Sequence, residues 1–286
     1  MDHQDEAGAN SDQVAYWNAA AGQTWAELQD RLDAQLQPLG ERLLQALAPT
    51  PGEAVLDIGC GCGATTLALA EAVGPDGAVT GVDISYPMLE VARRRVGAAG
   101  LSQARLVEAD AQTHGFAPGG FDAAFSRFGV MFFSDPAAAF ANIRGGLKPG
   151  GRLAFICWRA LPQNPWMLVP VATALERLAV PAPPPPDPLA PGPFAFADPD
   201  RVRSILERAG YAQIEITPHD QKIGARDLDQ AAAIALKVGP LGALLREQPD
   251  KAPMVVDAVR DALAQHLTPE GVRLDSATWI VQARAP

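Results

Sequence analysis

Val55-Leu56-Asp57-Ile58-Gly59-Cys60-Gly61-Cys62-Gly63 is the stretch that decides the fold, and it continues directly into Ala64-Thr65-Thr66-Leu67-Ala68-Leu69-Ala70. A short apolar run carries one acid, three alternate glycines follow, and a segment rich in alanine and leucine comes next. This order predicts a strand, a tight turn and a helix N-terminus, the first unit of a doubly wound α/β fold. Glycine suits such a turn because a Cβ would obstruct a sharp bend or a ligand. The turn is expected to present backbone N–H groups and the positive end of a helix dipole to one point.

Asp57 bears on which ligand this turn suits. Gly59, Gly61 and Ala64 fit the G-x-G-x-x-G/A fingerprint of dinucleotide-binding turns, but Asp57 would then place negative charge beside a pyrophosphate. A ligand with an ammonium group next to a carboxylate suits the turn better, because the amides can meet the carboxylate and Asp57 the ammonium. The run D-x-G-x-G-x-G resembles the first motif of class I methyltransferases that use S-adenosylmethionine (SAM). A packing turn in another kind of α/β protein is the structural alternative.

Two further acids follow predicted strands. Residues 77–83 read as a buried strand that ends in Asp83, and an acid at the tip of the second strand is where a ribose is held through its hydroxyls. Residues 104–109 read as a third strand, followed by Asp110 and Ala111. The resemblance implies that Asp110 bonds the adenine amine, while the neighbouring backbone N–H binds a ring nitrogen. The carboxyl ends of parallel strands share one sheet edge, so the three acids are expected there together.

The later strands complete the resemblance. Residues 121–128 predict a fourth strand and 151–158 a fifth, preceded by the turn Lys148-Pro149-Gly150-Gly151, which is also familiar in this family. The motifs span about residues 50–160 and are similar to small-molecule methyltransferases of the ubiquinone- and menaquinone-biosynthesis type. The implied fold is an α/β, Rossmann-like, seven-stranded sheet, mostly parallel with an antiparallel last strand. Helices are expected on both faces, with an added helical cap.

The pattern divides the chain into seven stretches. Helical periodicity over 13–48, broken near Pro38, predicts helices that could pack on the core, and the resemblance supports an N-terminal helical lid over the cofactor. The full set is a disordered tail 1–12, the lid 13–48, a SAM-binding core 49–160, a proline-rich cap insertion 161–200, a core helix and sixth strand 201–220, a helical cap insertion 221–275, and the last core strand 276–286.

The resemblance implies SAM as the cofactor and a set of residues that contact it. These predicted cofactor-binding residues are Trp17, Trp25, Asp57, Gly59, Cys60, Gly61, Asp83, Ile84, Met88, Asp110, Ala111, Ser126, Arg127 and Phe128. Methyl transfer requires mainly proximity and orientation, so no catalytic residue is assigned. His114, His219 and Asp220 are the candidates for a base, should the acceptor need one.

The composition of the chain argues against several classes of binding partner. A net charge of −10 and a pI near 4.9 argue against a nucleic-acid substrate. Cys60 and Cys62 lack the additional Cys or His ligands that a zinc site needs, so small residues filling a turn are expected and no metal. The N-terminus has no apolar signal region and no long apolar span occurs, which predicts a cytoplasmic protein without a membrane span. A homodimer is left open.

Three functions are weighed. The leading one is SAM-dependent methyl transfer to a small-molecule acceptor by in-line displacement. The alternatives are an NAD(P)-dependent oxidoreductase, which leaves Asp57 and Asp110 unexplained, and a non-catalytic SAM-binding protein. An apolar or aromatic acceptor is expected from the supply of aromatic side chains, which could equally be core. These are Trp17, Trp25, Phe128, Trp158, Trp166, Phe194 and Phe196.

Overall fold

A mixed sheet forms the centre of the computed structural model, which describes residues 10–181, 184 and 187–286. The strand order is β3-β2-β1-β4-β5-β8-β6, and the short β7 pairs with β8. β8 runs antiparallel to β5, β6 and β7, while the other pairs are parallel. The predicted seven-stranded sheet with an antiparallel last strand is therefore confirmed. The strands are β1 (Ala54–Ile58), β2 (Ala78–Asp83), β3 (Ala104–Glu108), β4 (Phe121–Arg127), β5 (Leu147–Trp158), β6 (Ala212–Ala225), β7 (Leu267–Thr268) and β8 (Gly271–Arg284).

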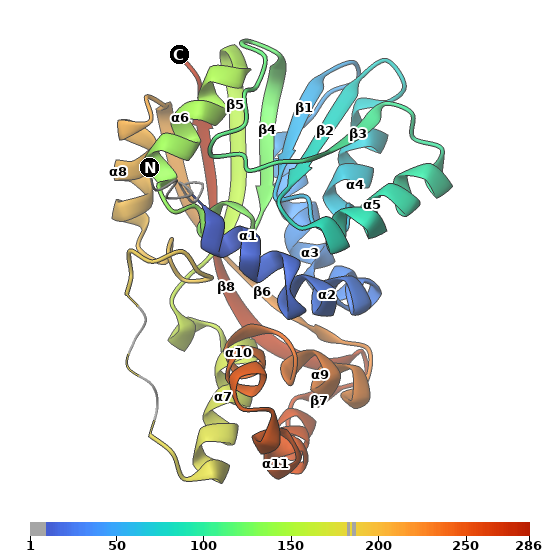
Figure 1. The fold of residues 1–286 in the computed structure, drawn as a ribbon, viewed down its shortest axis with the longest axis vertical. Coiled ribbons are helices and arrows are strands. Elements are labelled where there is room, and N and C mark those ends of the chain that lie inside the picture. The colour runs from blue at the N-terminus through green and yellow to red at the C-terminus, as the bar shows by residue number, and fades with distance from the viewer. Residues whose placement is uncertain (1–9, 182–183, 185–186) are drawn as a thin grey trace, which may run out of the picture.

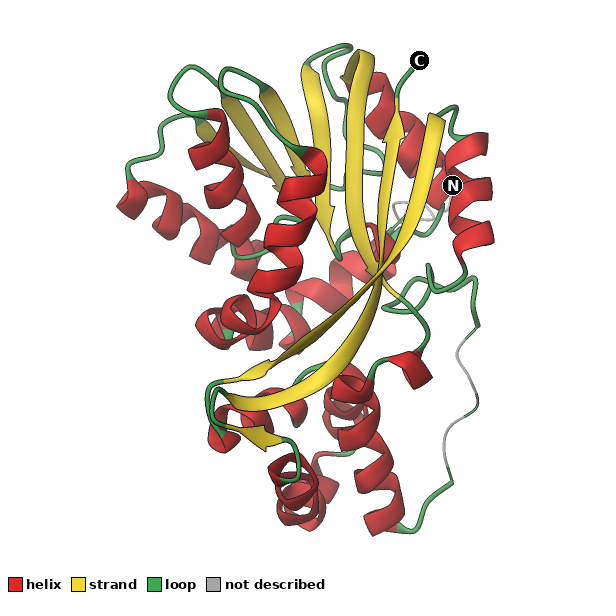
Figure 2. Cartoon of the chain, turned by 180° about the vertical axis from the view of Figure 1, so that it is seen from behind, coloured by secondary structure: helices red, strands yellow, loops and turns green. Residues whose placement is uncertain are grey.

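Helices cover both faces of this sheet (Figures 1 and 2). The chain steps from β1 outward through β2 to β3, then returns to place β4 on the other side of β1. Right-handed crossovers therefore put α4 and α5 on one face and α6 on the other. The helices are α1 (Ser11–Asn18), α2 (Ala20–Glu27), α3 (Gln29–Leu47), α4 (Ala64–Val73), α5 (Tyr86–Ala99), α6 (Pro136–Gly146), α7 (Pro165–Leu178), α8 (Pro199–Arg208), α9 (Leu228–Ala235), α10 (Gly239–Glu247) and α11 (Ala252–Ala264), with 3-10 turns η1 (Val130–Phe132), η2 (Leu161–Gln163) and η3 (Pro249–Lys251).

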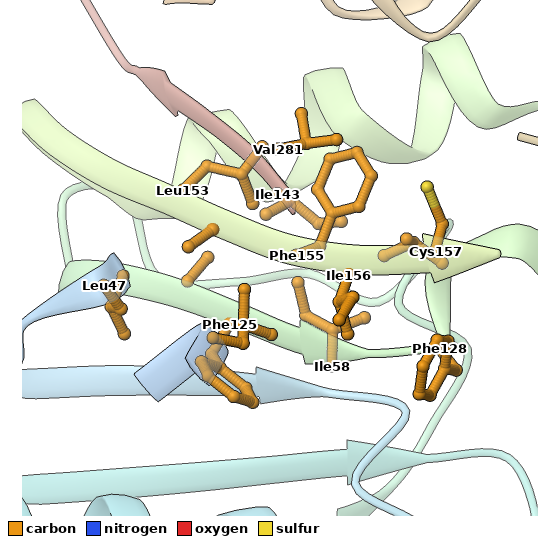
Figure 3. Close-up of a cluster of buried hydrophobic side chains, with 14 of the residues drawn as sticks. Leu47, Ile58, Phe125, Phe128, Ile143, Leu153, Phe155, Ile156, Cys157 and Val281 are labelled. Carbon is orange, nitrogen blue, oxygen red and sulfur yellow. The ribbon is translucent and has the colours of Figure 1, made fainter. Parts of the chain in front are cut away.

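The main core lies around β4 and β5. Phe125, Phe155, Ile156 and Val281 are at most 1% exposed and belong to one cluster of buried side chains (Figure 3). Both faces of these central strands are covered, so their inward and outward side chains are apolar alike. The strands that carry the glycine turn are thus anchored on a rigid base.

A second cluster forms the cap, defined here as α7, α9, α10, α11 and the adjoining ends of β6 and β8. Its buried members include Val171, Leu241, Val255 and Leu274. β6 and β8 run on together past the ends of the parallel strands, and the cap helices gather on this extension (Figure 2). In Figure 1, α1 and α2 lie between the sheet and the cap.

The structure differs from the sequence expectations at several boundaries. Pro38 does not break its helix, because α3 continues through it, and the breaks fall at Ala19 and Leu28. The last strand begins at Gly271 instead of 276, since pairing with the lengthened β6 extends it. Ser11 already starts α1, so only residues 1–9 of the predicted tail lie outside the described residues. Within the proline-rich insertion 161–200, residues 182–183 and 185–186 also lie outside them.

No single described helix is both long and apolar enough to cross a membrane. α9 and α10 meet that test only when taken together, and they are bent by 58° relative to each other.

Candidate functional site

The strand order reverses between β1 and β4, and the acids gather at the carboxyl edge beside this point. Asp57 lies near the end of β1, Asp83 ends β2, and Asp110 follows β3. Open α/β sheets bind their ligands at such a reversal. Ser126 ties β4 to β1 there, because its Oγ donates to the Ile58 carbonyl at 2.8 Å and accepts the Gly129 amide at 3.2 Å. This fully buried hydroxyl supports the site from within the scaffold.

The three alternate glycines have different roles. A Cβ on Gly59 would lie 2.7 Å from the Gly129 Cα, and a Cβ on Gly63 would lie 2.9 Å from the Cβ of Ala92. Both glycines are therefore required by packing. Gly61 also has a positive φ, +53°, but the nearest atom to its Cβ position is the Met88 Sδ at 3.8 Å. Gly61 is thus the glycine of the three that leaves room for a ligand.

Most amides of the turn already have acceptors. The N–H groups of Gly59 and Cys60 donate to the Val82 carbonyl at 2.8 and 3.2 Å, and Gly61 donates to Asp83 Oδ2 at 2.7 Å. Gly59 and Cys60 therefore do not offer their amides to a ligand in this structure. The Cys62 amide donates to no other atom in the described part of the chain, which leaves it for a ligand.

Asp57 is a buried carboxylate with one oxygen unpaired. The hydroxyls of Thr65 and Thr66 both donate to Oδ2, at 2.7 and 2.6 Å, whereas Oδ1 is buried with no donor among the described residues. Burial raises the pKa of Asp57 to about 6, against the lowering effect of the two threonines. A carboxylate held in this way gains from a cation beside Oδ1.

Asp83 is held in one orientation by the backbone. Its Oδ1 accepts the Ser85 amide at 2.8 Å and its Oδ2 accepts the Gly61 amide. Burial raises the pKa of this carboxyl although both amide bonds oppose the shift. The side chain keeps 8% exposure, and each oxygen retains acceptor capacity for a further donor. Asp83 can therefore accept hydrogen bonds from ligand hydroxyls.

The third acid lies in a turn that is pinned to α6. Asp110 is half-buried, and its Oδ1 accepts the Gln112 amide at 2.9 Å. The Ala111 carbonyl accepts the Asn142 side-chain amide at 2.9 Å. These bonds hold Asp110 and Ala111 at the same carboxyl edge as Asp57 and Asp83.

α1 and α2 lie over this edge. Asn18 bonds both sides of the loop that follows β2, because its Nδ2 donates to the Ile84 carbonyl at 2.8 Å and its Oδ1 accepts the Tyr86 amide at 2.8 Å. Ser85 Oγ donates to the Trp17 carbonyl at 2.7 Å. The rings of Trp17 and Trp25 pack near Met88 in a small apolar cluster. These contacts bring the predicted residues Trp17, Trp25, Ile84 and Met88 together at the glycine turn.

Aromatic rings gather at the ends of β4 and β5. Phe128 and Trp158 stack with centroids 4.0 Å apart and planes 7° apart, and Trp158 lies 5.1 Å from Trp166. Trp17 meets Phe132 edge-on at 5.1 Å. Phe196, by contrast, is 1% exposed in the main core, and Phe194 packs against that core. Phe128 and Trp158 also belong to the main buried cluster, whereas Trp17 and Trp25 pack beside the glycine turn.

Arg127 lies on the face of the sheet to which Asp57 also points, and its charge counteracts the rise in the pKa of Asp57. Its guanidinium pairs with Asp33 of α3 at 3.3 Å, and Arg95 pairs with the same carboxylate at 2.9 Å. The side chains of successive strand residues alternate between faces, so Arg127 points toward α3. Ser126 and Arg127 both hold the strand ends in this structure, and their contact with a cofactor stays a prediction.

The three candidate bases do not come together. His114 packs edge-on against Phe116. His219 lies on β6, where burial and the neighbouring Arg42 lower its pKa. Asp220, also on β6, pairs with Arg159 at 2.8 Å beside a hollow of about 480 Å³. β5 and β8 separate both β6 residues from β4.

The three cysteines are free thiols. Burial raises the pKa of Cys62 to about 12, and it also raises the pKa of Cys60 and of Cys157. Within the ranges that the structure describes, no group of three His, Cys, Asp or Glu side chains could hold a metal ion.

Several residues at the site were not among those predicted from the sequence motif. Thr65 and Thr66, which hold Asp57, directly follow the turn and could have been found from their place on the first helical turn. Asn18 bonds Tyr86 and Ser85 bonds Trp17, each across 68 positions, and Phe132 reaches Trp17 only through tertiary folding.

Comparison with known proteins agrees with this geometry. Residues 55–151 match the family described as methyltransferase domain. Aklanonic acid methyltransferase DauC from Streptomyces sp. (strain C5) is 42% identical over 127 residues, which are 44% of this chain and 58% of that protein. Nocamycin O-methyltransferase from Saccharothrix syringae is 30% identical over 197 residues, which are 66% of this chain and 70% of that protein.

A solved structure shares the fold over most of its length. The YcgJ protein from Bacillus subtilis matches with a TM-score of 0.56 and 20% identity, over 86% of this chain and 98% of that one. The glycine turn, the acids at the strand ends and these relatives agree. The chain belongs to the family of class I SAM-dependent methyltransferases.

Proposed function

We propose that this protein transfers a methyl group from SAM to a small-molecule acceptor by in-line displacement. The observation that carries the proposal is the buried Oδ1 of Asp57, which has no donor among the described residues, in the same strand–turn unit as the open position at Gly61. A bound dinucleotide would bring further negative charge to this point, whereas the ammonium of SAM would neutralise the carboxylate. SAM fits the residues present.

The chain's own residues divide the work of holding SAM. Asp57 would pair with the ammonium, and the Cys62 amide would donate to the carboxylate. Asp83 would accept from the ribose hydroxyls, and the Asp110–Ala111 turn would bind the adenine edge. SAM supplies an electrophilic methyl group on a sulfonium.

The acceptor is expected to be apolar or aromatic. The walls available to it are the rings of Phe128 and Trp158, which are 8% and 5% exposed. The names of DauC and nocamycin O-methyltransferase point to small organic acceptors for those relatives and support the same class here. Positioning against these rings and exclusion of water by α1 and α2 are the contributions that we assign to the protein. The cytoplasmic location and a homodimer stay predictions.

The test separates cofactor binding from turnover. Equilibrium dialysis should show binding of SAM and not of NAD, and Asp57→Asn should weaken SAM binding while the exposed control Asp76→Asn does not. Transfer of label from methyl-labelled SAM to a panel of aromatic acids, phenols and ketones then tests activity. Retained NAD in place of SAM would refute the cofactor assignment. SAM binding without transfer to any acceptor would favour the non-catalytic alternative.

A further inference from the structure

Trp166 is the second residue of α7, at the boundary between the main core and the cap. Its ring packs against buried residues of both clusters. Its indole Nε1 is buried, yet it donates to no acceptor within the described residues. Trp279 shows the ordinary arrangement, because its Nε1 donates to the Ala197 carbonyl at 2.9 Å. Trp166 is thus a buried donor that lacks a protein acceptor.

Such a donor is unfavourable on its own. A buried N–H has lost its bond to water, and folded proteins almost always supply a replacement acceptor. Phenylalanine would fill most of the same space without this loss. A hydrogen-bond acceptor on a bound ligand would replace the bond to water that the indole N–H has lost.

The surroundings indicate the shape of that partner. Trp166 lies 5.1 Å from Trp158, which in turn stacks on Phe128. Phe128 adopts a φ of +65°, a left-handed conformation that is unfavourable for a residue with a Cβ. The backbone therefore accepts strain at the point where this ring is placed. A row of flat rings with one free N–H suits a planar molecule that carries an oxygen.

Two surface contacts join the cap to the N-terminal helices α1 and α2. Tyr16 Oη bonds Arg246 of α10 at 2.7 Å, and Lys237 lies 3.7 Å from Glu27 of α2. All four side chains lie at the surface between the cap and the N-terminal helices, where such pairs are weak. A ligand that reaches Trp166 between the cap and α1 and α2 would have to break these weak pairs.

We propose that the Trp166 indole N–H selects the methyl acceptor by donating a hydrogen bond to an oxygen on a planar aromatic molecule. This inference rests on the proposed function, because it concerns the acceptor side of the same site. Trp166 is then a specificity residue: the rings of Phe128 and Trp158 bind the flat surface, and the N–H distinguishes oxygenated acceptors from hydrocarbons.

Two probes that differ in one group test the proposal: 2-acetonaphthone, which has a carbonyl, and 2-ethylnaphthalene, which has a methylene there. Calorimetry on the full chain first measures binding of S-adenosylhomocysteine, and then of each probe with that compound saturating. We expect Trp166→Phe to reduce the preference for the ketone by about fivefold to tenfold. Trp279→Phe is the matched control and should leave the preference unchanged, because its N–H bonds the protein.

The indole resonances of the ¹⁵N-labelled native chain provide a measurement that needs no variant to fold. The Trp166 Nε1–H signal should move on addition of the ketone and not of the hydrocarbon. An unchanged preference in Trp166→Phe, no selective movement of this signal, or no binding of either probe would overturn the proposal. If S-adenosylhomocysteine binds normally in that case, the proposed function stands; if it does not bind, the proposed function itself fails.

Discussion

Asp57→Asn should gain stability relative to the native chain as the pH rises, while weakening the hold of the protein on SAM. Burial raises the pKa of Asp57 from 3.8 to about 6, so the folded chain binds more protons than the unfolded chain between these values. The free energy of unfolding therefore falls as the pH rises through this window. A shift of this size corresponds to about 3 kcal/mol, of which about 2 kcal/mol develops between about pH 4.5 and pH 7. Asparagine keeps an oxygen for Thr65 and Thr66 and avoids this cost.

Urea unfolding of both proteins without cofactor measures the effect. The difference in unfolding free energy, variant minus native, should rise from about pH 4.5 to pH 7 and then level off. Asp122→Asn is the control of opposite sign. Burial tends to raise the pKa of Asp122, but the Lys148 ammonium at 2.6 Å, the Ala54 amide and the charge of Arg152 together outweigh it, and the pKa is lowered. That variant should lose stability relative to the native chain as the pH rises.

Asp57→Asn also tests the function. Loss of a charged partner for the ammonium should weaken SAM binding by about tenfold to a hundredfold at pH 7. A variant that is no more stable at pH 7 than at pH 4.5, relative to the native chain, would refute the reasoning about burial. Unchanged SAM affinity would refute the role of Oδ1, whatever happens to stability.

Three further variants, with Gly74→Ala as a control, test the rest of the site. Gly61→Ala and Gly74→Ala, both at positive φ in open space, should each cost about 1–2 kcal/mol of stability, but only Gly61→Ala should block SAM in calorimetry. Asp83→Ala should lower SAM affinity about tenfold to a hundredfold and should also destabilise the fold, because it removes the acceptors of two amides; equal affinity in a folded variant would contradict the ribose assignment. Asn18→Ala should speed hydrogen exchange over residues 11–27, and added SAM should slow it in the native chain; protection by SAM confined to 55–130 would show that α1 and α2 do not close over the cofactor.

The sequence alone was enough to determine the order of elements and the place of the acids. Apolar runs, alternate glycines and acids at strand ends are local patterns, and each acts within one strand–turn–helix unit. For this reason β1, β2 and β4 and the positions of Asp57 and Asp83 agree with expectation. Only element ends were misplaced, as at Gly271, where pairing with a distant strand sets the boundary.

Tertiary structure alone decided which of these residues are available to a ligand. Gly59 is closed by Gly129, seventy positions away, whereas Gly61 is open. Arg127 pairs with Asp33, and both Phe196 and Phe128 join the main buried cluster, where Phe128 stacks on Trp158. Availability depends on which distant surface packs against a residue, and residues far apart in the chain become neighbours only when the sheet, the N-terminal helices and the cap assemble.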